Sequence, residues 1–292
     1  MLLYVARRIV YVVPIVICVA LVCFLLVHIT PGDPLVAVLP ADASQELANQ
    51  LRAAYGFDRP LPAQFGLWLW RAINGDLGHS IATGRPVLSE VIHAVGNTVT
   101  LAIAAAAIGF SFGLFFGLIA GYFRDTWVDK LATSIAIAGV SVPHYWLGMV
   151  LVIIFSVELN WLPAVTTSVI PMGIVTRTVR ALTGDILSQD FIEALRAKGL
   201  RELDVFKHVV KNAAPTALAV MGLQLGYMLG GSILIETVFS WPGSGLLLNS
   251  AIFQRDLPLL QGTILVLALF FVILNLLVDI AQAAIDPRIK RG

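Results

Sequence analysis

The chain has 292 residues, of which 58% are hydrophobic and only 13% are charged, and its mean hydropathy is +0.88. These values exclude an ordinary soluble domain and indicate a protein of the lipid bilayer. The formal net charge of +1 gives no basic surface for binding nucleic acid. The positions of the charges along the chain are therefore more informative about function than their sum.

The first predicted element is an apolar run from Ile9 to about Thr30, preceded by Arg7 and Arg8. At about 1.5 Å per residue, the run is long enough to cross the roughly 30 Å hydrocarbon layer. No small-residue cleavage site follows it. We therefore predict an uncleaved N-terminal transmembrane helix over residues 1–30, with its amino terminus in the cytoplasm.

Residues 31–96 are more polar, and we predict an extracytoplasmic segment with short helices, the first over ASQELANQLRAAYG. Trp68 and Trp70 indicate that part of the segment lies at the lipid headgroups. Two interpretations stay open: a small external subdomain that packs on the helix ends, or a segment that contacts substrate.

Residues 97–283 form a predicted core of five further transmembrane helices, followed by a cytoplasmic tail over 284–292. The third crossing of the chain is long enough to expect a proline-associated kink at Val142–Pro143. The fourth is the least regular, because Pro171, Arg177 and Arg180 interrupt it. The expected crossings are about 97–123, 131–163, 164–182, 215–235 and 260–283.

This arrangement predicts an all-α polytopic membrane protein with six transmembrane helices and both termini in the cytoplasm. It places all but five of the 19 Lys and Arg residues on or near the inside, as the positive-inside rule requires. The five exceptions are Arg52, Arg59, Arg71, Arg85 and Arg255.

Glycines recur every four residues on two of the predicted helices. Such ridges of small residues let two helix backbones approach closely, so we predict helix packing along both. A role in lining or gating an inter-subunit pathway is the alternative. The positions are Gly109, Gly113, Gly117 and Gly121 on the second crossing and Gly222, Gly226 and Gly230 on the fifth.

Ionisable residues are scarce within the predicted crossings. Glu158 and Glu236 lie near outer ends and Asp279 near an inner end, so a proton or sodium relay is not expected. Cys18, Cys23 and the five scattered histidines predict neither a disulfide nor a metal site. A secondary transporter would need a midplane relay, and a membrane-bound enzyme would need a cluster of His, Asp or Glu. We therefore expect the energy for transport to come from another protein.

The most charged stretch is the predicted cytoplasmic loop over 183–213, which contains EALRAKG. We expect Ser188 to cap a short helix and Gly199 to end it in a left-handed conformation. A second helix over LRELDVFKHVVKNAA should place Leu203, Phe206 and Val209 or Val210 on one face, before Pro215 begins the next crossing. The element suits a rigid lever for a cytoplasmic partner, or a basic loop lying on anionic lipid.

EALRAKGLRELDVFKHVVKNAAP resembles the "EAA" loop of ABC-importer permeases. Glu193, Ala194 and Gly199 match that motif, whereas Leu195 stands where a second Ala is expected. Further stretches are similar to the dipeptide, oligopeptide, glutathione and nickel branch of the family: the Arg7–Arg8 start, PGDP, NGDLGHS, QDFIEALRAKGL, ETVFSWPGSG, and NLLVD with DPRI. The connection between WLPA and QDFIEAL is shorter than the family usually has.

The resemblance implies the type I importer fold, called MetI-like, and a permease subunit in a bacterial cytoplasmic (inner) membrane. Its implied partners are a second homologous permease in a heterodimer, two ATP-binding subunits and an extracytoplasmic substrate-binding protein. The implied cargo is peptides or similar small solutes, with a nickel chelate or glutathione as alternatives, because selectivity in this family resides largely in the binding protein.

The resemblance also implies roles for individual residues. The ATPase-coupling residues would be Glu193, Ala194, Leu195, Lys198, Gly199 and Phe206. Glu236 and Trp241 would contact the binding protein or act in gating, or would only pack at a helix end. Because the sequence contains no GxxxxGK[ST] loop, we expect no enzyme activity and no cofactor in this chain, with ATP and Mg bound by the partner ATPases.

Overall fold

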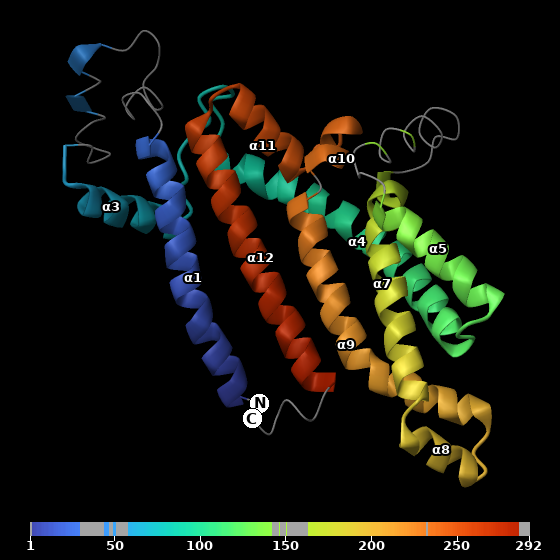
Figure 1. Cartoon of the computed structure of the whole chain (residues 1–292). Helices are drawn as coiled ribbons and strands as arrows, with labels where there is room; N and C mark the ends of the chain where they lie inside the picture. Colours follow the sequence, from blue (N-terminus) through green and yellow to red (C-terminus); the bar gives the residue numbers. More distant parts are fainter. Residues whose placement is uncertain are drawn as a thin grey trace. The chain divides into compact units, whose positions relative to one another are not determined.

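The structure, a computed structural model, describes residues 2–29, 44–46, 49–50, 58–141, 146, 150, 163–231 and 233–285. These residues are mostly helical and include no β-strand, so the all-α class is confirmed for them. The helices, drawn in Figure 1, are α1 (Leu2–Ile29), α3 (Leu61–Ile73), α4 (Val87–Tyr122), α5 (Trp127–Ser141), α7 (Pro163–Leu187), α8 (Asp190–Ala197), α9 (Glu202–Gly231), α10 (Ile233–Val238), α11 (Ser244–Phe253) and α12 (Leu257–Ile285).

Three of the described helices, α4, α9 and α12, are long and apolar enough to cross a membrane. The apolar stretches described in α1 and α11 are shorter. The third predicted crossing begins in α5, but its kink at Val142–Pro143 lies outside the described residues. So do Glu158, most of the helix predicted over ASQELANQLRAAYG, and most of the tail.

Helix α4 begins ten residues earlier than the predicted crossing, at Val87 rather than Asn97. Pro86 stands just before its first residue, where a missing N–H costs nothing, and Glu90 places a negative charge in its first turn. The Thr83 hydroxyl donates a hydrogen bond to Glu90 Oε1 at 2.7 Å. The polar start of α4 is therefore helical, although its polarity resembles the external segment.

The described residues form two compact units. The first comprises the described residues within 2–5, 99–239 and 274–285, and the second comprises those within 6–98 and 240–273. Helix α7 is central to the first unit, where it packs against both α5 and α9. A buried cluster joins α7 to α9 and α4 through Val175, Val179 and Ala217, with Phe110, Leu114, Leu118 and Met221 around them.

The predicted glycine ridge of α4 lies against α7. A Cβ atom at Gly113 would stand 2.8 Å from Val175 Cβ, and one at Gly121 would stand 2.5 Å from Thr183 Cβ. Gly109 and Gly117 meet the backbone oxygens of Ser168 and Thr176 in the same way. Each of four successive turns of α4 thus brings its backbone within reach of α7, which only glycine permits.

The glycines of α9 do not all lie alike. Gly222 is buried against Val278 of α12, and Gly226 is also buried. Gly230 is exposed, and a Cβ atom there would meet nothing within 4 Å. Close packing is therefore seen at Gly222 and not at Gly230.

Helix α9 is continuous from Glu202 to Gly231 and contains Pro215 in its interior. The prediction of a short helix that ends before a separate crossing is therefore wrong. In a membrane protein an internal proline is tolerated, because neighbouring groups can satisfy the freed backbone carbonyl. The predicted second helix of the loop and the following crossing therefore belong to one helix.

The second unit is built on α1, α3 and most of α12. Trp68 of α3 packs against Phe24 and Phe65, with ring centroids 6.0 and 6.2 Å apart. Trp70 is 67% exposed, so it is the more accessible of the two tryptophans that were predicted at the lipid headgroups. The buried Asp256 carboxylate accepts hydrogen bonds from Ser80 Oγ at 2.5 Å and from the amides of Ala82 and Leu259 at 3.1 Å.

Candidate coupling site

The charged stretch that contains EALRAKG folds as an elbow between α7 and α9. Figure 1 shows α8 beyond the end of α7 and beside the first turns of α9. Only Ser188 and Gln189 separate α7 from α8, and only residues 198–201 separate α8 from α9. Short connections therefore join α8 to both long helices.

Gly199 closes α8 in the left-handed conformation, with φ +78°, as expected from the sequence. The Gly199 amide donates to the Arg196 carbonyl at 2.9 Å, and the Leu200 amide donates to the Leu195 carbonyl at 3.3 Å. These two bonds form a Schellman motif, which satisfies the last carbonyls of the helix. The turn after α8 is therefore fixed by its backbone.

The other end of α8 differs from the prediction. Gln189, not Ser188, is the N-cap residue, and no side chain caps the helix. The Ser188 hydroxyl instead donates to the Asp185 carbonyl at 2.8 Å, at the end of α7. Asp190 and Glu193 still place negative charge in the first turn of α8, where it interacts favourably with the helix dipole.

One side of α8 is anchored in a small apolar core. Ile192 is fully buried there, and Leu195 and Leu200 are partly buried beside it. Helix α9 contributes Val205, Val209 and Ala213 to the same cluster, and α7 contributes Ile186. Burying side chains of this size contributes about 1.5–3 kcal/mol each, so α8 is held as part of the folded unit.

The buried face of α9 is the predicted one only in part, since it includes Val209 and half of Phe206 but not Leu203. Val205 and Val209 are buried, whereas Leu203 is 65% exposed. Phe206 is half-buried against Tyr122 of α4, with ring centroids 5.9 Å apart and edge to face. The apolar residues at 203, 205, 206, 209 and 210 fit two overlapping helical faces, and the position of α8 decides between them.

The opposite side of α8 is exposed. Phe191, Ala194 and Lys198 follow the i, i+3, i+7 spacing that places residues on one helix face. Glu193 is exposed beside them. Phe191 was not among the residues predicted from the motif, and an exposed aromatic side chain on an anchored helix is typical of a protein-binding surface.

A polar contact that the sequence did not indicate joins three helices behind this surface. Glu202, at the start of α9, accepts two hydrogen bonds from the Arg196 guanidinium of α8, at 2.9 and 3.1 Å. The Tyr122 hydroxyl of α4 donates to the same carboxylate at 2.6 Å. The bonds to Glu202 raise the pKa of Arg196, so the guanidinium stays charged. Tyr122 lies 80 residues away, and no local pattern relates it to Glu202.

The two residues predicted for gating or binding-protein contact are engaged within the chain. Glu236 of α10 is fully buried. Trp241 is half-buried, and its indole Nε1 donates to the Asn97 carbonyl at 3.1 Å. The Asn97 side chain in turn donates to the Pro242 carbonyl at 2.8 Å, which ties the WPG turn to α4.

Comparison with known proteins decides the family. Residues 113–291 match the family model described as the binding-protein-dependent transport system inner membrane component, and residues 1–102 match the model of its N-terminal part. The chain belongs to this family. It is the transmembrane permease of an ABC importer, a multi-pass inner-membrane protein that works with ATPase and binding-protein partners.

The permease is similar along its whole length to curated relatives. It is 38% identical over 304 residues to the glutathione transport system permease protein GsiC of Escherichia coli strain K12, covering 99% of each chain. The same figures hold for GsiC of Shigella boydii serotype 4. The 304 aligned positions exceed the 292 residues of this chain, so GsiC carries residues that this chain lacks.

A solved structure shares the fold. The inward-facing MetNI methionine ABC transporter matches with a TM-score of 0.60 at 16% identity, over 67% of this chain and 96% of the other. The predicted MetI-like fold is therefore confirmed.

Proposed function

We propose that this permease is one of two non-identical permease subunits of an importer for glutathione or short peptides, and that α8 couples it to an ATP-binding subunit. The observation that carries the proposal is the two-sided α8, anchored through Ile192 and exposed through Phe191, Ala194 and Lys198. Peptidic cargo is supported by the relatives at 38% identity, which are named as glutathione permeases.

In this proposal, closure of the ATP-binding subunits displaces α8, and the elbow converts the displacement into movement of α7 and α9. A flexible loop would dissipate such a displacement, whereas α8 is held by a buried core, a Schellman turn and the contact with Glu202. The residues that touch the ATPase are Phe191, Glu193, Ala194 and Lys198. Leu195, Gly199 and Phe206 support that surface from behind or set its turn.

The energy comes from the partners. The permease carries no GxxxxGK[ST] loop, and the described residues hold no group of three or more His, Cys, Asp or Glu that could bind a metal ion. Because the sequence lacks that loop, we propose that ATP and Mg bind to the ATP-binding subunits, and that this chain has no enzyme activity or cofactor of its own. Both termini are placed in the cytoplasm by the positive-inside rule.

The alternative of a basic loop lying on lipid is less well supported. Arg196 pairs with Glu202, and both Arg201 and Lys207 pair with Asp204 at 3.2 and 2.9 Å. Acidic partners thus offset most of the positive charge near α8. A surface that attracts anionic lipid needs uncompensated Lys or Arg.

The test is to tag the permease at its carboxyl terminus, purify it from gently solubilised native membranes, and identify the proteins recovered in stoichiometric amounts. We expect a second permease and ATP-binding subunits. The complex, reconstituted with its binding protein, should import labelled glutathione or a labelled alanine tripeptide only with ATP. If the complex imports a nickel chelate but neither glutathione nor the tripeptide, the proposed cargo is wrong. Uptake without ATP by this chain in the absence of its partners would overturn the whole proposal.

A further inference from the structure

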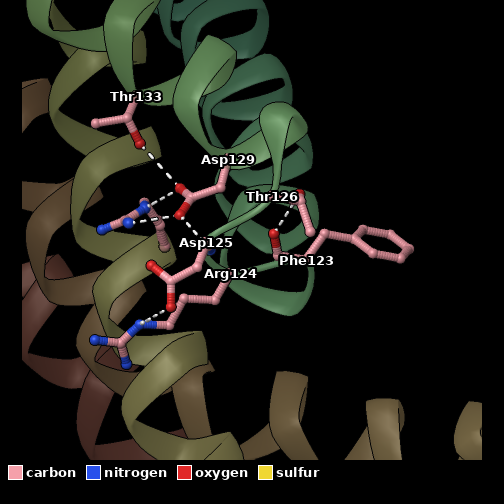
Figure 2. A network of polar contacts seen from close by, with 7 residues as sticks. Phe123, Arg124, Asp125, Thr126, Asp129 and Thr133 are labelled. Carbon is pink, nitrogen blue, oxygen red and sulfur yellow. Dashed lines mark hydrogen bonds and ion pairs between the residues drawn. The ribbon is translucent and has the colours of Figure 1, made fainter.

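The start of α5 carries a nearly buried carboxylate that is not explained by the α8 elbow. The Asp129 side chain is 3% exposed and pairs with Arg180 of α7 through both of its oxygens, the Nη2 bond being 2.7 Å long. As Figure 2 shows, Thr133 and the turn at Asp125 lie around the same carboxylate. The Thr133 hydroxyl donates at 3.1 Å and the Asp125 amide at 2.9 Å.

These contacts tie together the turn before α5, α5 itself and α7. Asp125 has a left-handed φ of 65°, and its amide is held by Asp129, which lies in the first turn of α5. The Arg180 hydrogen bonds hold the pKa of Asp129 well below its usual range, so the carboxylate stays ionised. Four hydrogen bonds occupy the acceptor positions of one carboxylate.

The ion pair lies on the seam where α5 and α7 pack. Gly173 lies seven residues before Arg180 and therefore on the same face of α7. A Cβ atom at Gly173 would stand 2.8 Å from the Ala136 carbonyl oxygen of α5, and Ala136 lies seven residues after Asp129. The antiparallel seam thus has one register: Ala136 opposite Gly173, and Asp129 opposite Arg180.

The other side of α7 packs on the glycine ridge of α4, where Gly109, Gly113, Gly117 and Gly121 present no side chains. These contacts recur every four residues along α7, so a shift of α7 by one helical turn would place similar contacts against the ridge. A two-pronged ion pair differs, because a shift by one helical turn, about 5.4 Å, would break it completely. The pair therefore selects one height of α7 among those that packing permits.

We propose that Asp129 and Arg180 are positioning residues that lock α7 in register with α5, so that α8 moves the transmembrane helices together with it. The proposal rests on α8 being the coupling element. Because α8 follows Leu187 after two residues, the height of α7 sets the height of α8. Without the lock, ATP hydrolysis would move α8 while α7 slipped along the seam.

The test compares ATP hydrolysis with solute uptake in the complete complex in lipid vesicles, using labelled glutathione and a labelled alanine tripeptide. Arg180→Ala and Asp129→Ala should raise the ATP consumed per solute imported at least about fivefold, the lower end of typical coupling between sites. The matched control is Arg177→Ala, because Arg177 is exposed on the same helix. That variant should leave the ratio unchanged.

Rescue separates register from simple folding stability. Exchanging the two residues, Asp129→Arg with Arg180→Asp, restores an ion pair but loses the bond to the Asp125 amide, so the ratio should return part of the way. Arg180→Lys keeps the positive charge but cannot form the two parallel hydrogen bonds of a guanidinium. Its ratio of ATP consumed to solute imported should lie between those of wild type and Arg180→Ala. An unchanged ratio in the alanine variants, or loss of assembly in every variant including the exchange, would overturn the proposal. Failure of wild type to use ATP would instead refute the proposed function.

Discussion

At the scale of single residues, glycine is needed for two different reasons: a left-handed backbone at some positions and a close helix contact at others. A Cβ atom at Gly199 would meet nothing within 4 Å, so lack of space does not explain the glycine. Its left-handed φ of +78° does. Gly121 is required for proximity, because a Cβ atom there would stand 2.5 Å from Thr183 Cβ and 2.7 Å from the Arg180 carbonyl. The sequence suggested both roles, through the end of a helix in one case and a four-residue repeat in the other.

Gly199 offers a matched pair of substitutions. Gly199→Asn should preserve coupled transport, because Asn tolerates the left-handed region. Gly199→Val should destabilise the turn by about 1–2 kcal/mol or more, since a branched Cβ clashes there. Uptake per ATP hydrolysed in vesicles measures the effect, and equal uptake by the two variants would show that the left-handed turn is not needed.

At the scale of helices, repeated patterns were more informative than single boundaries. The four-residue repeat on α4 corresponds to a close contact with α7, but the same repeat on α9 ends at Gly230, which faces open space. Boundaries depended on context: polar residues extend α4 back to Val87, and α9 continues through Pro215. The buried face of α9 could not be read from its sequence, since it depends on where α8 lies.

The α4 ridge can be tested with one kind of substitution at two sites. Gly117→Ala would place a methyl group 2.7 Å from Val179 Cβ, so the helices must separate, at a cost of about 1–3 kcal/mol. Gly230→Ala meets no neighbour and gains up to about 1 kcal/mol of helix propensity. Thermal unfolding in detergent should show a lower Tm for Gly117→Ala only, and equal Tm values would contradict the packing role.

At the scale of the whole molecule, hydropathy and motifs predicted the all-α class and the importer family, because both follow from many residues along the chain. The polar contacts between helices were not predictable. Glu202 with Tyr122, and Asp129 with Arg180, join residues 80 and 51 positions apart, and nothing in the local sequence marks one partner for the other. Phe191 was missed for a simpler reason, because the motif begins two residues later and does not include it.

The central claim is that the exposed face of α8 touches an ATP-binding subunit, and site-specific cross-linking tests it most directly. A photo-reactive residue at Ala194, which is exposed, should cross-link the ATP-binding subunit in the purified complex. The same residue at Ser89, which is exposed near the start of α4, should not. A cross-link from Ala194 to the ATPase would establish α8 as the coupling element. Cross-linking of Ala194 to lipid alone, in a complex that contains the ATPase, would contradict the account.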